Sequence, residues 1–344
     1  MKRVKINNKW IGDDYPCYTV AEIGTGFKNF DEAKNLIDAA IEVRIDAIKF
    51  QTFEAETITT KKNYVNLKET GKISQYDLFK ELQVSKELQM KIVNYANEKG
   101  ITIFSEPSHM KDLETMKSMN LPAYKIGSDL ACHIPLLKEM AKLEKPIILS
   151  TGMCNLDEVK ESVRAILSTG NDQVILMHCV TNYPSFIEEI NLNAIITMKN
   201  EFDFPIGYSD HSIGILPTLT AATLGANIIE KHFRHEKNTA SPDDIHSLVK
   251  EEFQELIKQI RMIELAKGSG LKEPTKSELD NIQTSRVSII ASSNIQKGTP
   301  ISENLIDIKR PGTGIPPKFF SEIMRKRTLR DIEKDEPITM QDIE

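Results

Sequence analysis

The sequence predicts a parallel (β/α)8 barrel, the TIM barrel, followed by a small β-rich domain. Short runs rich in β-branched residues alternate with longer amphipathic stretches from residue 18 to about residue 265. Eight such pairs fill about 250 residues, which is the usual size of this barrel. The chain then becomes polar and rich in glycine and proline, which separates the barrel from the residues that follow.

Each predicted strand precedes a segment with helical spacing, such as DEAKNLIDAAIEV or NLDEVKESVRAILSTG. A doubly wound parallel sheet is the main alternative, but it predicts a glycine-rich phosphate loop after its first strand. The corresponding segment, EIGTGF, has two glycines and no third. The predicted strands of the barrel are residues 18–24, 46–52, 101–107, 123–129, 146–152, 173–179, 205–210 and 227–233.

A long polar connection, residues 53–82, follows the second predicted strand. Most strand-to-helix connections in such units are much shorter, at about two to six residues. Because this segment would lie over the mouth of the barrel, we interpret it as a lid or as a simple surface excursion.

The last sixty or so residues contain short strands, turn signals and two corners rich in proline and glycine. A segment of this length buries only a small apolar core by itself, so we expect it to pack against the barrel or against another subunit. We therefore divide the chain into a barrel domain (1–268), a linker (269–283) and a small domain (284–344).

Composition excludes several classes of protein. The 344 residues carry 44 Lys and Arg against 50 Asp and Glu, a net charge of −6, without the basic stripe that a nucleic-acid-binding protein needs. No apolar run is long enough to span a bilayer, and the start MKRVKINNKW lacks an apolar signal core, so we expect a cytoplasmic protein. The four cysteines are scattered without a CxxC pair, which favours reduced thiols.

Lysines near the ends of two predicted strands indicate an anion site. Active sites of such barrels form at the carboxyl ends of the strands, where Lys49 and Lys125 lie. A lysine buried without a partner is costly and usually finds an anion. We therefore expect a multiply charged ligand, the alternative being that each lysine pairs with a structural carboxylate. Ser150 and Ser209 add hydroxyl donors of the kind that hold phosphate or carboxylate oxygens.

Two histidines suggest a metal site. His211 and His232 end the seventh and eighth strands, which are neighbours in a closed barrel, and the acidic Asp243 follows. Two nitrogen ligands with open positions are typical of a weakly held catalytic Mn²⁺, Mg²⁺ or Co²⁺ rather than structural zinc. A metal-dependent hydrolase is the rival class, although the first strand lacks its His-x-His pair. Four other histidines are interpreted as surface or loop residues: His109, His133, His235 and His246.

A series of ordered motifs resembles one known family. The motifs are KFQTF, KIGS, PIILSTGM, MHCVTNYP, IGYSDHSIGI, LGANIIEKHF, SPDD and KRPGTGIPP. Together they resemble the N-acetylneuraminate (sialic acid) synthase family, which includes the related synthases of legionaminic and pseudaminic acid. The end of the chain resembles the antifreeze-like (SAF) domain that follows the barrel in that family.

The resemblance implies condensation of phosphoenolpyruvate with an open-chain N-acetylated hexose, usually N-acetylmannosamine, to N-acetylneuraminate and phosphate. It places a divalent metal, most often manganese, on His211 and His232. It implies catalytic roles for Glu22, Lys49, Lys125 and Asp243, and substrate-binding roles for Gln51, Ser128, Ser150, Tyr183 and Ser209. Arg286 matches an arginine that reaches into the partner subunit's site, which implies a domain-swapped homodimer.

The sequence departs from the family pattern at four places. The usual Asn-His-Asn-Gly after Glu22 is replaced by Gly26-Phe27-Lys28-Asn29. The other departures are Leu130 for a glutamate, Glu106 for a threonine and Asp244 for a histidine. They bear on sugar identity and allow a second interpretation, a catalytically inactive barrel that binds a sugar.

Overall fold

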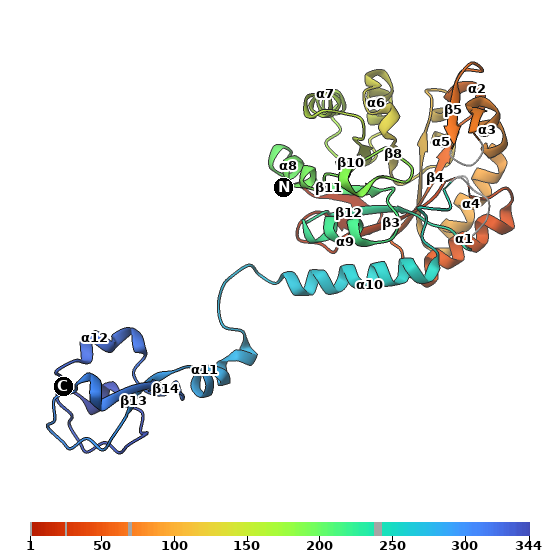
Figure 1. Ribbon diagram of the computed structural model, residues 1–344. Coiled ribbons are helices and arrows are strands. Elements are labelled where there is room, and N and C mark those ends of the chain that lie inside the picture. Colours follow the sequence, from red (N-terminus) through yellow and green to blue (C-terminus); the bar gives the residue numbers. More distant parts are fainter. Residues whose placement is uncertain (1, 25, 68–70, 237–242) are drawn as a thin grey trace. The chain divides into compact units, whose positions relative to one another are not determined.

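Eight parallel strands close into a barrel surrounded by helices in this computed structural model (Figure 1). The structure describes residues 2–24, 26–67, 71–236 and 243–344. Its contacts divide the chain into two units, Met1–Gly268 and Ser269–Glu344. The first unit confirms the predicted fold class, and the second contains the small β-rich domain.

The barrel strands follow one another in chain order around the closed sheet, and the last strand pairs with the first. All eight coincide with predicted strands. The eighth-to-first pairing sets His232 beside Glu22, and the next pair sets Glu22 beside Lys49. The strands are β3 (Tyr18–Gly24), β4 (Ala47–Thr52), β7 (Thr102–Pro107), β8 (Tyr124–Ile126), β9 (Ile147–Ser150), β10 (Val174–Cys179), β11 (Ile206–Asp210) and β12 (Ile228–His232).

Local sequence signals fix where the outer helices begin and end. Asn29 accepts the backbone N–H of Glu32 at the start of the first helix, and Asn155 and Glu158 form a capping box. Gly100 ends another helix with φ +77°, a conformation that glycine adopts at little cost. The helices of the barrel are α1 (Phe30–Glu42), α4 (Lys86–Lys99), α5 (Asp112–Ser118), α6 (Ile134–Ala141), α7 (Leu156–Leu167), α8 (Asn193–Glu201), α9 (Leu216–Thr223) and α10 (Lys250–Lys267).

The apolar core explains why polar side chains gather at one end of the barrel. One cluster fills the space between strands and helices. A second cluster lies inside the barrel and includes Val4, Ile6 and Ile11 from the hairpin of β1 (Val4–Ile6) and β2 (Lys9–Ile11). Because this hairpin closes the amino-terminal end of the strands with apolar groups, the buried polar groups are left at the carboxyl end.

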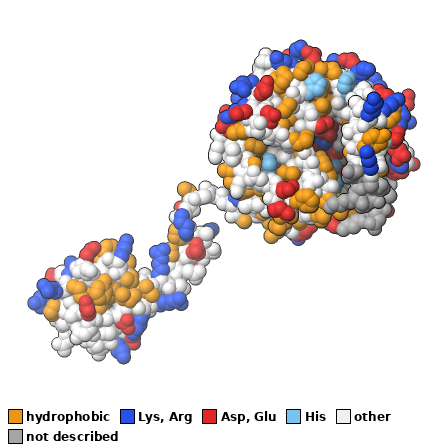
Figure 2. Space-filling view, turned by 45° about the horizontal axis from the view of Figure 1, so that its top comes forward, with side chains coloured by type: hydrophobic (Ala, Val, Ile, Leu, Met, Phe, Trp, Pro, Cys, Tyr) orange, Lys and Arg blue, Asp and Glu red, His pale blue; other side chains and the backbone are white. Residues whose placement is uncertain are grey.

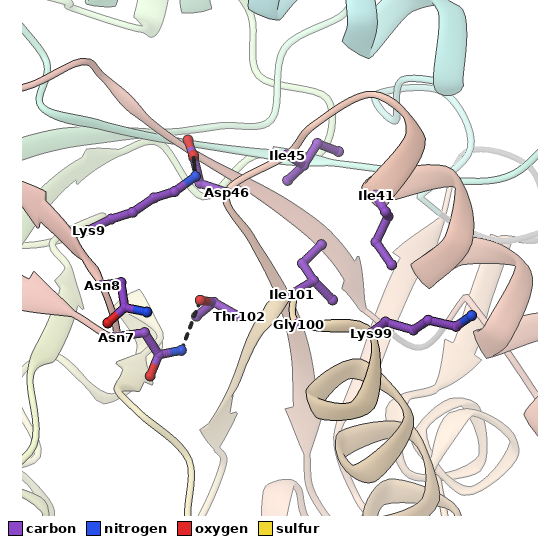
Figure 3. A pocket seen from close by; sticks show the side chains of 10 residues that line it. All are labelled: Asn7, Asn8, Lys9, Ile41, Ile45, Asp46, Lys99, Gly100, Ile101 and Thr102. Atoms are coloured by element: carbon purple, nitrogen blue, oxygen red, sulfur yellow. Dashed lines mark hydrogen bonds and ion pairs between the residues drawn. The ribbon is translucent and has the colours of Figure 1, made fainter.

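A hollow of about 480 Å³ opens at the amino-terminal end of the barrel (Figure 3). Thr102 and Asp46, at the starts of two strands, lie on its wall. The Asn7 amide donates to the Thr102 hydroxyl at 2.9 Å, and the Lys9 ammonium pairs with Asp46 (Figure 3). Because these polar groups pair with one another at the end opposite to the usual site of a barrel, we assign this hollow a structural role.

The long connection after β4 is folded. It contains α2 (Ala55–Ile58), an antiparallel pair of β5 (Tyr64–Leu67) and β6 (Gly71–Ser74), and α3 (Gln75–Leu82). Phe53 and Phe79 pack edge to face with ring centroids 5.3 Å apart. The segment is therefore a small subdomain, and its movement as a lid stays a prediction.

The second unit has its own apolar core. The helix α11 (Leu279–Ser285) precedes the antiparallel strands β13 (Ser288–Ala291) and β14 (Ile306–Lys309), and α12 (Phe320–Ile323) follows. The segment interpreted as a linker is thus partly helical at its end. The Gly312 N–H donates to the Gln283 carbonyl at 2.7 Å, which attaches that end to the small unit.

Among the described residues, no helix is both long and apolar enough to cross a membrane. All four cysteines are free thiols, as their spacing predicted.

Gly207 tests the close packing of the barrel. A Cβ atom there would lie 2.3 Å from Ile228 Cγ2 and 2.5 Å from the Ile228 carbonyl oxygen. We expect Gly207→Ala to lower the free energy of unfolding by about 1–3 kcal/mol or more, measured by urea unfolding. Gly12→Ala, whose Cβ would meet its nearest atom at 3.3 Å, is the matched control, and equal effects of the two substitutions would contradict the packing described here.

Candidate active site

Lys49 and Lys125 converge inside the carboxyl end of the barrel. Their side chains come from β4 and β8, and the two residues are only 4% and 2% exposed. Both ammonium groups lie near Glu230 Oε1, at 3.6 Å from Lys49 and 3.4 Å from Lys125. Both also face Glu106 Oε2, at 3.0 and 3.8 Å respectively. The two lysines therefore share one buried cluster.

The cluster contains more acidic than basic groups. Glu22 Oε2 lies 2.5 Å from Lys49 Nζ, so three carboxylates surround two ammonium groups. The lysines are thus paired with structural carboxylates, and an anionic ligand must compete with these pairs. Lys and Arg are intermixed with Asp and Glu over the visible face of the larger unit (Figure 2).

The pairing favours the ionised forms of Glu230 and Lys125. Burial raises the pKa of Glu230, but Lys125, Lys49 and the Ser209 hydroxyl outweigh it and bring that pKa down to about 2. Burial lowers the pKa of Lys125, but Glu230 and Glu106 outweigh it, so the net shift is upward. Burial in a low dielectric strengthens each of these charge interactions.

Three serines lie around the cluster. The Ser209 Oγ donates to Glu230 Oε1 at 3.0 Å. The Ser150 Oγ is buried and has no hydrogen-bond partner among the described residues. The Ser128 Oγ accepts the Gly152 N–H at 3.0 Å, and a Cβ on Gly152 would approach that oxygen to 2.8 Å. Ser150 therefore offers a free hydroxyl to a ligand.

His211 and His232 lie side by side at the mouth, with ring centroids 5.4 Å apart. The Val180 carbonyl lies 3.0 Å from His211 Nδ1, and because a carbonyl only accepts, this nitrogen carries the proton. The lone pair of Nε2 is then available to a metal. Burial lowers the pKa of His211 to about 4 and that of His232 well below its usual value, so both rings are neutral at pH 7, as metal ligands are.

The interpretation of His246 as a surface or loop residue is wrong in one respect. The residue lies in a turn, but it is only 1% exposed and its ring centroid is 4.6 Å from that of His232. The one sequence feature that could have indicated this is its position three residues after Asp243. Neither ring nitrogen has a hydrogen-bond partner among the described residues, a state that costs about 1–3 kcal/mol for a buried polar group.

The residues at the mouth fit a divalent metal. Ligand atoms of His232, Asp243 and His246 all lie within 4.8 Å of one another. Nitrogen and carboxylate donors suit Mn²⁺, Co²⁺, Fe²⁺ or Zn²⁺. A bound cation would account for one of the two unpartnered nitrogens of His246.

The remaining predicted site residues lie at different depths. The Tyr183 ring is 53% exposed and its centroid is 4.2 Å from that of His211, which places it at the entrance. Gln51 follows Lys49 by two residues on β4 and is half-buried. Asp243 Oδ2 is 3.6 Å from His232 Nδ1. Arg286 belongs to the second unit, where it follows α11 and is exposed.

The departures from the family pattern have physical explanations in the structure. Phe27 belongs to the apolar core, and Leu130 packs against it. Glu106 lies in the lysine cluster. Burial and the neighbouring Glu106 raise the pKa of Asp129. Asp244 pairs with the Arg234 guanidinium.

A buried ion pair behind the site was not identified from the sequence. Lys231 Nζ lies 3.0 Å from Asp210 Oδ2, and both side chains are fully buried. Asp210 also accepts the Ser212 N–H at 2.8 Å and the Thr218 hydroxyl. Alternation along β11 and β12 turns this pair away from Ser209 and Glu230. The pair therefore ties the ends of two strands that carry site residues.

Comparisons with known proteins agree with this geometry. The model of the NeuB family matches residues 36–272, and that of the SAF domain matches residues 286–344. An N,N'-diacetyllegionaminic acid synthase of Campylobacter jejuni is 36% identical over 93% of this chain and 98% of its own. The human N-acetylneuraminate-9-phosphate synthase is 30% identical over 96% of this chain and 93% of its own.

A solved structure extends the likeness to three dimensions. The N-acetylneuraminic acid synthetase of Leptospira borgpetersenii, solved with citrate, has a TM-score of 0.74 and 31% identity. The alignment covers 82% of this chain and 95% of that chain.

Fold and site together define a barrel enzyme with buried lysines at the carboxyl ends of its strands and histidines at its mouth. The chain belongs to the NeuB family, and it carries a SAF domain. NeuB-type proteins are nonulosonic acid synthases, which condense phosphoenolpyruvate with a sugar.

The buried pair behind the site gives a stability prediction. We expect Lys231→Met to lower the free energy of unfolding by about 3–5 kcal/mol, because it leaves the Asp210 carboxylate buried without its cation. The exposed pair of Lys117 and Glu114 is the control, and Lys117→Met should cost about 0–1 kcal/mol. Urea unfolding of both variants measures the difference, and similar values would mean that the buried pair contributes little.

Proposed function

We propose that this protein condenses phosphoenolpyruvate with an N-acetylated aldohexose to give a nine-carbon 2-keto acid and phosphate. N-acetylmannosamine is the first acceptor proposed, with N-acetylneuraminate as the product. The observation that carries the proposal is the convergence of Lys49 and Lys125 with Glu230 and Ser209, beside the histidines. Membership of the NeuB family supports the same reaction class.

In this proposal the barrel interior holds phosphoenolpyruvate. Lys49 and Lys125 neutralise its phosphate and carboxylate, while the hydroxyls of Ser128, Ser150 and Ser209 donate to its oxygens. The free Ser150 Oγ fits this role, because a bound oxygen would satisfy it.

The Glu106 side chain must move away from the two lysines when phosphoenolpyruvate binds. Its side chain is 14% exposed, against 1% for Glu22 and 4% for Glu230, so it is the carboxylate that can turn toward solvent at least cost. We propose that Glu106 leaves the two lysines as phosphoenolpyruvate enters. The exchange keeps the lysines paired at every stage, which avoids a buried uncompensated charge.

At the mouth, a divalent metal on His211 and His232 would act as a Lewis acid on the sugar aldehyde. Tyr183 and Gln51 hold the sugar, and Glu22 or Asp243 transfers protons. Burial raises the pKa of Asp243, which is the direction that favours a carboxyl group able to return a proton. The methylene carbon of phosphoenolpyruvate bonds to the aldehyde carbon, water adds at the adjacent enol carbon, and phosphate leaves by C–O cleavage.

A 2,4-diacetamido hexose is the second candidate acceptor. The support is the similarity to N,N'-diacetyllegionaminic acid synthases, at 36% identity in Campylobacter jejuni and 34% in Legionella pneumophila. The core positions of Phe27 and Leu130 also remove polar groups that the sialic acid synthase pattern places on the sugar side.

We further propose a domain-swapped homodimer in which Arg286 holds the N-acetyl group in the partner subunit's site. The Arg286 side chain is exposed, and no ion pair engages it among the described residues. An arginine in this state can reach an external ligand without losing an internal partner.

A coupled assay tests the function. With Mn²⁺, phosphoenolpyruvate and N-acetylmannosamine, the protein should release phosphate and a 2-keto acid in equal amounts. A parallel panel of 2,4-diacetamido hexoses should identify the better acceptor, and chelation of the metal should stop turnover. Sugar binding by calorimetry without turnover on any acceptor would favour the inactive barrel and refute the synthase.

Mixing two defective variants tests the swapped dimer. Lys125→Ala should abolish turnover, because it removes a cation that holds phosphoenolpyruvate, and Arg286→Ala should raise the sugar KM far more than the phosphoenolpyruvate KM. A mixed dimer contains one site with an intact barrel and an intact arginine only if Arg286 acts across subunits. Activity at low sugar concentration should therefore recover when the variants are unfolded, mixed and refolded together. Recovery no greater than the sum of the separately refolded variants would show that Arg286 serves its own subunit's site or none.

A further inference from the structure

We propose that His246 is a third imidazole ligand of the divalent metal at the mouth, together with His211 and His232, and that Asp243 supplies a carboxylate oxygen. This inference rests on the metal site of the proposed function and extends it to a residue outside the two-histidine set. A third imidazole ligand also bears on which metal ion the site binds most tightly.

The rings of the three histidines lie close together at the mouth. The centroid of His246 lies 4.6 Å from that of His232 and 6.1 Å from that of His211. The ring centroids of His211 and His232 are 5.4 Å apart. Side chains at these separations can place one nitrogen each within about 2.1 Å of a common ion after small rotations.

Asp243 lies between two of these rings. Its two carboxylate oxygens are 3.6 Å from His232 Nδ1 and 3.6 Å from His246 Nε2. Both distances exceed a hydrogen bond, but they match two ligand atoms on adjacent positions of one coordination sphere. Among the described residues, only one other group of potential ligands is as close, and it lies at Cys132, Cys154 and Glu158.

Apolar packing does not explain the burial of His246, because an imidazole with 1% exposure normally bonds at least one nitrogen. Both of its nitrogens lack a hydrogen-bond partner among the described residues. A buried and unpartnered imidazole that lies beside two others can give one ring nitrogen to a common ion.

The turn that carries His246 is fastened to β12, so the ring position is set by the backbone. The Leu248 N–H donates to the His232 carbonyl at 2.9 Å, and the Arg234 N–H donates to the Leu248 carbonyl at 3.1 Å. The Ser247 N–H donates to the Asp243 carbonyl at 3.1 Å. Asp244 pairs with Arg234. His246 is therefore held beside His232 before any ion arrives.

A third imidazole predicts a selective site. Imidazole suits Zn²⁺, Co²⁺, Fe²⁺ and Ni²⁺, whereas Mg²⁺ prefers oxygen ligands and keeps its water. We therefore expect Co²⁺ to bind much more tightly than Mg²⁺. Removal of His246 should reduce this difference in affinity between the two ions.

The experiment measures Co²⁺ binding to the chelator-treated full chain, by equilibrium dialysis and by visible absorption of the bound ion. His246→Ala and His246→Asn should each weaken Co²⁺ binding by at least about 10- to 100-fold, the loss seen when even an indirect partner of a metal is removed. Both should also shift the absorption bands, since the ligand set changes. His235→Ala is the matched control, because His235 is a half-exposed histidine outside the cluster, and it should change neither quantity.

His211→Ala distinguishes failure of the third ligand, His246, from failure of the metal site itself. If His211→Ala weakens Co²⁺ binding and the His246 variants do not, the third ligand is refuted while the metal site of the proposed function stands. If the unmodified chain binds no Co²⁺, both are refuted. X-ray absorption of the cobalt-loaded wild-type chain counts imidazoles without any substitution, so it decides the question even where a variant fails to fold. Three imidazoles support the proposal, and two overturn it.

Discussion

The rest of the site depends on one constraint, the burial of two ammonium groups inside a closed barrel. Lys49 and Lys125 cannot lie there alone, because a charge removed from water needs a partner. Glu22, Glu106 and Glu230 provide it. Each of these residues comes from a different strand, so the cluster exists only when the barrel is closed. The same charges that secure the folded state are those that an anionic substrate must engage.

Alternation along the strands sorts the polar residues into separate layers. Ser209 and Glu230 face the interior, while Asp210 and Lys231 pair on the side of the helices. The next positions, His211 and His232, reach the mouth. In the proposed function, three successive positions at the end of each of these neighbouring strands would serve anion binding, structural anchoring and metal binding in turn. Substitution of the anchoring pair would disturb both functional layers, because it lies between them in sequence.

The departures from the family pattern fall into two physical groups. Phe27 and Leu130 exchange polar groups for apolar packing. Glu106 and Asp244 add negative charge, which is balanced in different ways: Glu106 lies beside the lysines, and Asp244 pairs with Arg234. The last pairing also fixes the turn that presents His246.

The sequence by itself determined the barrel, because strand and helix periodicity are local properties that repeat eight times. It also placed Lys49, Lys125, His211 and His232 at strand ends, since alternation and strand order fix these positions. Only the tertiary structure decided what those residues meet. The pairing of the lysines with Glu106 and Glu230, and the burial of His246, depend on distances between segments far apart in the chain. Such distances are set by closure of the whole barrel, and no local pattern carries them.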